Sequence, residues 1–202
     1  MTIEMLIPTW GKRYLAGTLD GDPVAASRLC VSMGNDQRGE AAVVLWQMAI
    51  PAPAYRVFLL GAWEHDHRHV LAAADYDASR LRSMFEHAAF DTSALPKTLT
   101  VWRGTAGIDR HEAAAGLSWT TSRPMACWFA MRHADQLGRP LVLRLEVHRS
   151  EIALFTNGRN EAEAIIFQDA DVLPAVDGTP DDWRRHFEAE EARIRQYSEL
   201  LP

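Results

Sequence analysis

The spacing of apolar residues changes near residue 95, and this change constrains the fold more than any other feature of the chain. Before it, apolar side chains such as Val57 and Leu60 recur every three or four positions, which is typical of amphipathic helices. After it, they alternate with polar residues, as Leu141 and Leu143 do, which is typical of strands. Helices followed by short strands predict an α+β protein rather than a parallel βαβ array.

Four helices are expected before residue 95. Asp22 is a good N-cap for the first, with Pro23 at its first position and Gly34 as its stop. The second is expected at Glu40–Ile50, the third at about Pro53–Leu71, and the fourth after a Ser79 cap, with Leu81, Met84 and Phe85 on its apolar side.

Short strands are expected in the second half of the chain. They are Leu99–Arg103, stopping at Gly104, then Leu141–Val147, Glu151–Phe155, Glu161–Phe167 and Asp171–Val176. One helix interrupts them, capped by Ser122 and ending at Gly138, and a last helix begins at Thr179 and Pro180. The expected organisation is a helical segment at 1–95 that packs on a core at 96–176, followed by a C-terminal helix at 177–202.

Composition narrows the class of protein. The chain has 202 residues, of which 48% are apolar, and a net charge of −6. No apolar run approaches the roughly 18 residues that cross a bilayer, and the first ten residues lack a basic segment, so a cytoplasmic protein is expected. Basic and acidic residues balance between 96 and 174, which does not favour general nucleic-acid binding. Cys30 and Cys127 lie far apart and are expected to be buried thiols.

Arg103 is the first candidate functional residue. Alternation places it on the same strand face as Leu99 and Val101, where a guanidinium requires a partner. It either turns into solvent at the strand end or binds a carboxylate or phosphate with paired N–H groups.

Ser118 and Thr120 are the next candidates. They alternate with Trp119 in a short strand before the Ser122 cap, so both hydroxyls face the same side. Such a segment usually serves helix capping, but small polar side chains on a strand face also line ligand sites.

Glu161 and Glu163 are the third candidate pair. If both lie on one strand, they point to the same side, roughly 6.6 Å apart, and each raises the pKa of the other. They mark either a solvated edge strand or a functional carboxylate pair. Asn157-Gly158 ahead of them predicts a hairpin turn.

The order of these three segments resembles the Arg-Ser-Glu branch of the ADP-ribosyltransferase superfamily, which includes bacterial toxins and phage-encoded enzymes. The branch has a strand-end Arg, then a Ser-containing strand that runs into a helix, then Glu-x-Glu at the start of a strand. The resemblance covers roughly residues 96–174. It implies two packed antiparallel sheets, with NAD bound as co-substrate in the cleft between them.

The resemblance implies these cofactor contacts. Arg103 would contact the NAD phosphates, and Gly104 would let the chain approach the dinucleotide closely. Ser118-Trp119-Thr120 stands where the family usually has Ser-Thr-Ser, so Trp119 departs from the pattern. The helix after Ser122 also begins without the longer loop that in many relatives carries an aromatic residue and an Arg. Trp119, Trp128 or Phe155 would then stack on nicotinamide.

The catalytic roles follow from the same resemblance. Glu163 would hold the ribose and stabilise the positive charge that develops as nicotinamide leaves. Ser118 would support Glu163, and Glu161 would position or deprotonate the acceptor.

The expected function is a mono-ADP-ribosyltransferase that acts on a macromolecule in its own or a target cytoplasm. Glu161 favours arginine side chains of a protein as acceptors, and an antitoxin or other inhibitor is a possible partner. Three alternatives stay open: modification of a nucleic-acid base, hydrolysis of NAD, and a catalytically silent binding module. No membrane partner is expected.

The histidines of Glu64-His65-Asp66-His67-Arg68-His69 invite a metal site. On one helix, side chains at i and i+2 diverge, so the three histidines do not bind one ion. His65 and His69 share a face, but no cysteine or inward carboxylate joins them. No metal is therefore expected.

Overall fold

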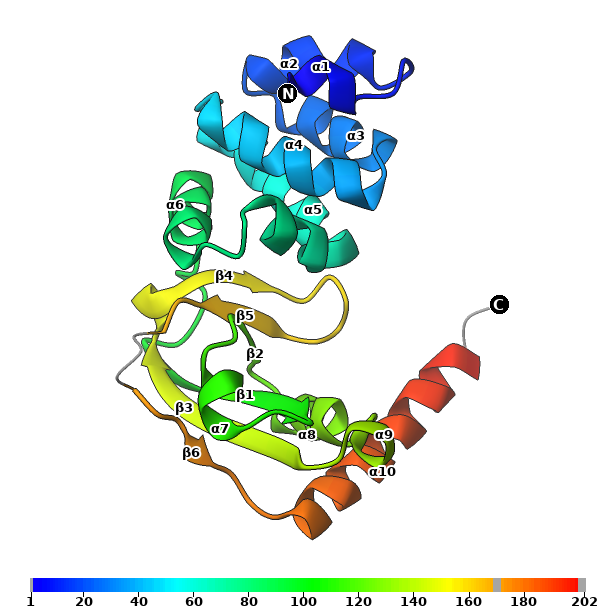
Figure 1. Ribbon diagram of the computed structural model, residues 1–202, viewed down its shortest axis with the longest axis vertical. Coiled ribbons are helices and arrows are strands. Elements are labelled where there is room, and N and C mark those ends of the chain that lie inside the picture. The colour runs from blue at the N-terminus through cyan, green and yellow to red at the C-terminus, as the bar shows by residue number, and fades with distance from the viewer. Residues whose placement is uncertain (1, 169–171, 200–202) are drawn as a thin grey trace. The chain divides into compact units, whose positions relative to one another are not determined.

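The computed structural model describes residues 2–168 and 172–199, and the chain forms two compact units, Met1–Phe90 and Asp91–Pro202 (Figure 1). The boundary lies close to the change in apolar spacing. Residue 171, where the last strand was expected to start, lies outside the described residues.

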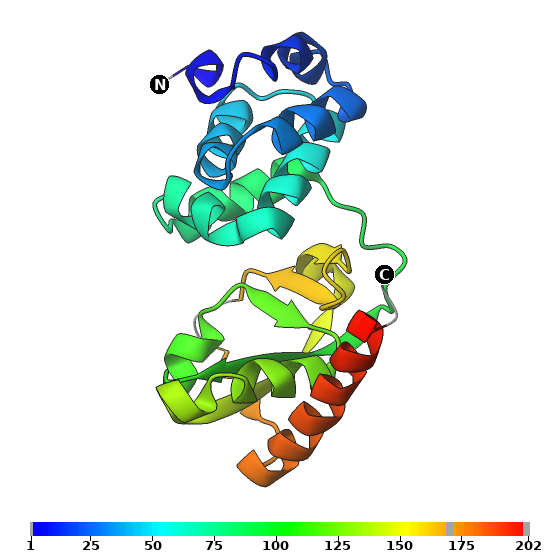
Figure 2. The ribbon, with the colours of Figure 1, turned by 90° about the vertical axis from the view of Figure 1, so that its right-hand side faces the viewer.

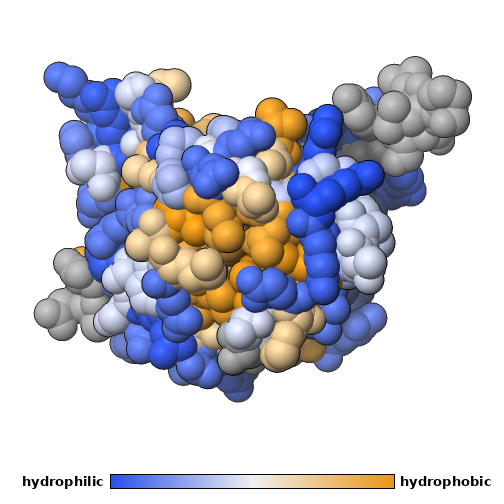
Figure 3. All heavy atoms as spheres, turned by 90° about the horizontal axis from the view of Figure 1, so that it is seen from above, coloured by the Kyte–Doolittle hydropathy of each residue, from blue (hydrophilic) through white to orange (hydrophobic). Residues whose placement is uncertain are grey.

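The N-terminal unit is helical. Its elements are α1 (Ile3–Leu6), the 3-10 helix η1 (Lys12–Tyr14), α2 (Leu15–Leu19), α3 (Pro23–Ser32), α4 (Asn35–Gln47), α5 (Ala52–Ala73) and α6 (Ala78–Ala88). Helix α5 packs against both α3 and α4, and Leu29, Leu45 and Phe58 are buried. Apolar side chains gather on the face seen in Figure 3, and Met5 and Val31 are among the exposed ones of this unit.

Local capping explains where these helices begin. Asp22 accepts a hydrogen bond from the Val24 amide at 2.8 Å, which confirms it as the N-cap of α3. Asp77, and not Ser79, caps α6, because its carboxylate accepts from the amides of Ser79 and Arg80. Gly34 is the N-cap of α4 rather than the end of α3.

Helix α5 is kinked, which the apolar spacing does not predict. Asp66 has an extended backbone (φ −164°, ψ 90°) inside the helix. Its carboxylate accepts a hydrogen bond from the Arg68 amide at 3.2 Å, as an N-cap does, so the second half of α5 begins anew.

The second unit is an antiparallel sheet covered by helices (Figure 2). Its strands are β1 (Thr98–Ala106), β2 (Ser118–Thr120), β3 (Pro140–His148), β4 (Ile152–Thr156), β5 (Glu163–Ile166) and β6 (Ala175–Val176), in the order β4-β5-β2-β1-β3-β6. Its helices are α7 (Arg110–Ala114), α8 (Arg123–Met131), α9 (Ala134–Leu137), η2 (Arg149–Glu151) and α10 (Pro180–Glu199). The predicted α+β class is confirmed.

The neighbouring strands of this sheet pair over very different lengths. Strands β1 and β3 pair along their whole length, whereas β1 and β2 share the single pair Trp102 and Thr120. The hydrogen-bonded network therefore consists of two three-stranded halves, β4-β5-β2 and β1-β3-β6, that meet at one residue pair. The resemblance implied two packed sheets, and the structure has one continuous sheet with a narrow joint.

Several predicted bounds in this unit are wrong. Gly104 does not stop β1, which continues to Ala106. The helix capped by Ser122 ends at Met131, and a separate short helix, α9, precedes Gly138. Strand β6 has only two residues, and α7 was not expected. The predicted cap of the last helix is confirmed, since the Asp182 amide donates to Thr179 Oγ1 at 3.4 Å.

Two apolar clusters hold the second unit together. One includes Val101, Trp119 and Leu143, and the other lies between α8, α10 and the sheet and includes Ala126 and Trp183. Cys30 in the first unit and Cys127 in this one are buried free thiols, as expected. Every helix in the described parts of the chain is too short or too polar to span a membrane.

Candidate functional site

Ser118 and Glu163 lie on neighbouring strands. Strand β2 runs antiparallel to β5, with Thr120 opposite Glu163 and Ser118 opposite Ile165. Opposed residues share a face, so both hydroxyls and the carboxylate lie on one side. Ser118 Oγ donates a hydrogen bond to Glu163 Oε1 at 2.5 Å. Because the Glu163 side chain is only 3% exposed, this hydroxyl orients a buried carboxylate.

Arg103 reaches the same strand from β1. Its Nε donates to the Ala113 carbonyl at 2.9 Å, and its Nη1 donates to the carbonyl of Ser118. Arg103 pairs with Leu143 of β3, so it lies on the aliphatic face as alternation predicts. It does not turn into solvent at a strand end, and Ser118 now links it to Glu163.

The guanidinium of Arg103 fits because Gly116 has no side chain. A Cβ at Gly116 would overlap Nη2 and Cζ of Arg103. Burial lowers the pKa of Arg103 to about 10, while the negative charge of Glu163 acts in the opposite direction. Gly116 therefore makes room for the Arg103 guanidinium. It was not among the expected site residues, and the sequence signal that could have found it is that the residue is a glycine.

Glu161 does not lie on a strand with Glu163, so the predicted 6.6 Å strand geometry is wrong. Strand β5 starts at Glu163, and the residues on either side of Glu161 have left-handed backbones, with φ of 58° at Asn160 and 47° at Ala162. The loop nevertheless brings the two carboxylates to one cation. Nη2 of Arg159 lies 2.9 Å from Glu161 Oε2 and 3.1 Å from Glu163 Oε2.

The electrostatics of Glu161 reflect this crowding. Burial raises its pKa above the ordinary value and the charge of Glu163 acts in the same direction, whereas Arg159 and Arg132 lower it. Glu161 is thus a stronger base than a carboxylate in water.

Thr120 holds the loop rather than facing a ligand, which differs from its predicted cofactor contact. Its hydroxyl donates to the Glu161 carbonyl at 2.6 Å and accepts from the Ser122 amide at 3.0 Å. The side chain is buried. Thr120 therefore fixes the segment before Glu163 and the start of α8 together.

Trp119 and Phe155 are corrections to the predicted nicotinamide contacts. Trp119 is 2% exposed within the apolar cluster, and its Nε1 donates to the Gly116 carbonyl. Phe155 packs on the same cluster and pairs with Ala164, one residue out of step with Glu163, so it lies on the other face of the sheet. The Trp119 ring belongs to the core, and the partly buried Phe155 ring packs against it.

Gly104 allows strand β1 and helix α8 to pack closely together. A Cβ there would overlap the carbonyl oxygen of Ala126 in α8. The resemblance implied that this glycine admits a dinucleotide, but the space beside it is filled by α8.

The end of α8 carries a cation that sequence reasoning missed. The Arg132 guanidinium lies 4.7 Å from the Trp128 ring centre and 4.6 Å from that of Phe129. Burial lowers the pKa of Arg132, and the charge of Glu161 acts in the opposite direction. Trp128 also donates to Glu191 Oε1 of α10 at 2.6 Å, so one of its edges is fixed.

The histidine segment makes local contacts. His65 Nδ1 lies 2.6 Å from the Gly61 carbonyl, and His69 Nε2 lies 3.6 Å from Asp66 Oδ2. Within residues 2–168 and 172–199, no three histidine, cysteine or acidic side chains are grouped as metal ligands.

Comparison of the chain with protein families, with curated proteins and with solved structures finds no match. The chemistry of the site therefore rests on its own geometry. A buried carboxylate held by a hydroxyl is suited to stabilising a developing positive charge, and a second carboxylate of raised pKa is suited to accepting a proton. The Arg159 guanidinium beside them pairs with both carboxylates.

Proposed function

We propose that the second unit is an NAD-dependent mono-ADP-ribosyltransferase that modifies a macromolecule. The observation that carries the proposal is the hydrogen-bonded series Arg103, Ser118 and Glu163, supplied by β1, β2 and β5. The Arg-Ser-Glu resemblance needs these residue types in this order and in contact.

The residues fit NAD as a co-substrate. The resemblance assigns Arg103 to the NAD phosphates. In the structure its Nε and Nη1 donate to two backbone carbonyls and its Nη2 lies against Gly116, so it braces the Ser118 strand beside the site. Glu163 accepts from Ser118 through Oε1 and from Arg159 through Oε2, and in the proposal a ribose hydroxyl takes the place of the Arg159 contact. When bound, NAD supplies a ribose–nicotinamide bond that leaves positive charge on the ribose as it breaks.

Each carboxylate then has its own task. Glu163 is buried, so its negative charge stabilises the developing positive charge more strongly than it would in water. Glu161 has a raised pKa and accepts the proton that a nucleophilic acceptor loses. Ser118 and Arg103 keep Glu163 in place.

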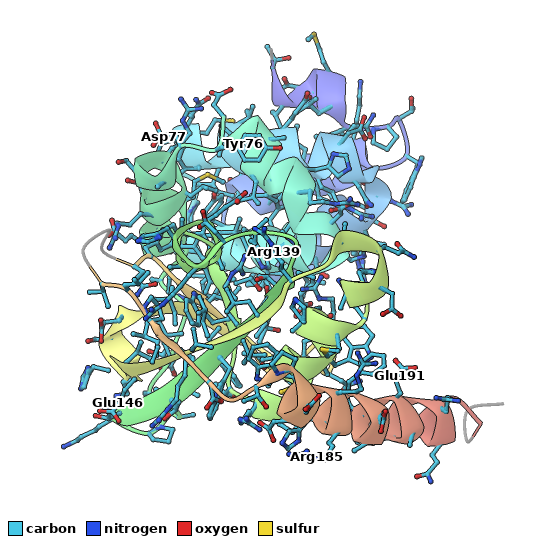
Figure 4. The ribbon with its side chains drawn as sticks, turned by 60° about the horizontal axis from the view of Figure 1, so that its bottom comes forward. Tyr76, Asp77, Arg139, Glu146, Arg185 and Glu191 are labelled. Atoms are coloured by element: carbon cyan, nitrogen blue, oxygen red, sulfur yellow. The ribbon has the colours of Figure 1, made fainter. Side chains whose placement is uncertain are left out.

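The test is incubation of the purified protein with NAD labelled on its adenylate, alone and with cell lysate. We expect nicotinamide release and label on protein. The Glu163→Gln variant should lower both by about 10²–10³-fold, as deletion of one transition-state stabiliser does. The matched control is Glu146→Gln, an exposed strand glutamate that should retain the wild-type rates (Figure 4).

Other outcomes change the conclusion. Label on nucleic acid would identify a base-modifying enzyme with the same site, and free ADP-ribose without any label on macromolecules would identify an NAD hydrolase. The absence of turnover in every fraction would overturn the proposal in favour of a binding module.

A further inference from the structure

One nitrogen atom of Arg159 contacts both candidate catalytic carboxylates. Arg159 lies in the loop between β4 and β5, and its Nη2 is within 3.1 Å of an oxygen of Glu161 and of Glu163. The Arg159 side chain is 32% exposed and that of Glu161 25%, so the contact lies at the edge of the buried site. A guanidinium nitrogen therefore stands where the two carboxylates converge.

The loop is built to keep Arg159 there. The Ala162 amide donates to Asn157 Oδ1 at 3.0 Å, and the Thr121 amide donates to the Ala162 carbonyl at 2.9 Å. Thr120 fixes the carbonyl of Glu161. These hydrogen bonds hold both ends of the loop in place. Because Arg159 and Glu163 are only four residues apart, the contact between them forms within one chain.

We propose that Arg159 is a site of self-modification, at which the enzyme attaches ADP-ribose to its own guanidinium. The inference rests on the proposed function and adds the acceptor atom, Nη2. The bond between ribose C1′ of NAD and the nicotinamide nitrogen breaks, and nicotinamide leaves with that electron pair. Nη2 forms the new bond to C1′, and its proton passes to Glu161 and then to water.

Of the other arginines of this unit, Arg132 lies over the Trp128 and Phe129 rings and acts on Glu161 through its charge, and three more pair elsewhere. Arg103 donates to two backbone carbonyls, and Arg123 pairs with Asp177 and Asp182. Arg185 is 71% exposed and pairs with Asp182 on α10 (Figure 4). If solvent exposure alone decided which arginine is modified, Arg185 would be favoured. If contact with the glutamates decides it, Arg159 is favoured. Modification at one or the other therefore distinguishes a specific reaction from a random one.

The experiment incubates the whole purified protein with NAD, digests it and locates ADP-ribosylated arginine by mass spectrometry, while nicotinamide release is followed in parallel. We expect modification at Arg159 and none at Arg185. The fraction modified per unit time should not depend on protein concentration, because the reaction occurs within one chain. Arg159→Lys should abolish the self-label, whereas Arg185→Lys should leave it unchanged.

The outcomes distinguish this inference from the function on which it rests. Nicotinamide release with no modification at Arg159, or with labelling that rises with protein concentration, would overturn self-modification and leave the transferase proposal standing. No nicotinamide release by the wild-type protein would overturn both.

Discussion

Ser118 of β2 and Glu163 of β5 lie diagonally across this strand pair, on the same face of the sheet, with 2.5 Å between hydroxyl and carboxylate oxygens. The carboxylate is buried, so the hydroxyl replaces a hydrogen bond that water would otherwise provide. In the proposed function Ser118 is therefore a positioning residue for Glu163, whereas Arg103 acts on the Ser118 carbonyl.

Ser118→Ala should lower nicotinamide release by roughly 10–100-fold, since a hydrogen bond to a charged group is worth about 1.5–3 kcal/mol. The loss should be smaller than that of Glu163→Gln, because Ser118 acts through the carboxylate. Initial rates at saturating NAD measure the effect, and Ser79→Ala, at an exposed position of α6, is the control. A Ser118→Ala enzyme of wild-type rate would remove the positioning role.

Glu161→Gln is expected to affect the stability of the protein and the transfer of ADP-ribose in different ways. Burial and Glu163 raise the pKa of Glu161, so the folded protein retains a proton there at pH values where the unfolded chain has lost it. Stability from this group is therefore lost as pH rises from the ordinary glutamate pKa through the folded one. Above the folded pKa, ionised Glu161 opposes folding.

The glutamine variant should accordingly be at least as stable as wild type at pH 7, and the difference should vanish below about pH 4, where both states hold the proton. Its transfer to an acceptor should fall more than its hydrolysis of NAD. Urea unfolding at the two pH values measures the first effect, and labelled NAD measures the second. A variant less stable than wild type at pH 7 would show that the ion pair with Arg159 outweighs burial.

Much of the fold follows from local chemistry. Asp22, Ser122 and Thr179 predict helix starts correctly, because an N-cap satisfies amides only two or three residues away. Strands β1 and β3 follow from alternation. The kink at Asp66 was missed because the apolar spacing continues through it, and the two-residue β6 is too short to have a pattern.

The sequence indicates which residue types form the candidate site, but it does not indicate which other residues hold them in position. Ser118 contacts Glu163 through its hydroxyl and Arg103 through its carbonyl, whereas Gly116 and Arg159 were not expected to contact these residues. Those contacts join separate segments, or depend on the left-handed residues around Glu161, and neither is visible in a periodic pattern. The nicotinamide contact of Trp119 is expected only from the resemblance, which needs an aromatic residue in place of the missing loop, and the sequence pattern does not show that this ring is buried.

Arg103→Ala should weaken NAD binding and destabilise the second unit. The substitution removes the charged donor of the Ser118 carbonyl and one donor of the Ala113 carbonyl, which also accepts from the Gly116 amide at 3.3 Å, so a loss of about 1–3 kcal/mol is expected. Calorimetric titration with NAD, on protein shown to be folded by circular dichroism, isolates the binding effect. Unchanged affinity would return Arg103 to a purely structural role.

Gly116→Ala tests the same guanidinium without removing its charge. The added Cβ displaces Nη2 and Cζ of Arg103, so affinity for NAD should fall although the cation remains. An NAD affinity equal to that of wild type would show that the exact position of Arg103 does not matter for binding.

Gly104→Ala should be among the most destabilising single-methyl substitutions in the second unit. Gly104 pairs with Val142 in the interior of β1, and an added Cβ would overlap the Ala126 carbonyl oxygen and lie 2.9 Å from the Ala130 nitrogen. Both atoms belong to the backbone of α8, so the helix must move as a body. A loss of about 3 kcal/mol in the free energy of unfolding is expected from such overpacking.

Gly138→Ala is the matched control for this close approach. A Cβ at Gly138 meets nothing within 4 Å, but its φ of 67° is unfavourable for alanine by about 1–2 kcal/mol. Thermal unfolding should therefore rank wild type above Gly138→Ala and Gly138→Ala above Gly104→Ala. If the two variants melted together, the contact of α8 with β1 would be looser than the structure has it. Helix α8, which follows β2, would then not be held tightly against β1 at Gly104.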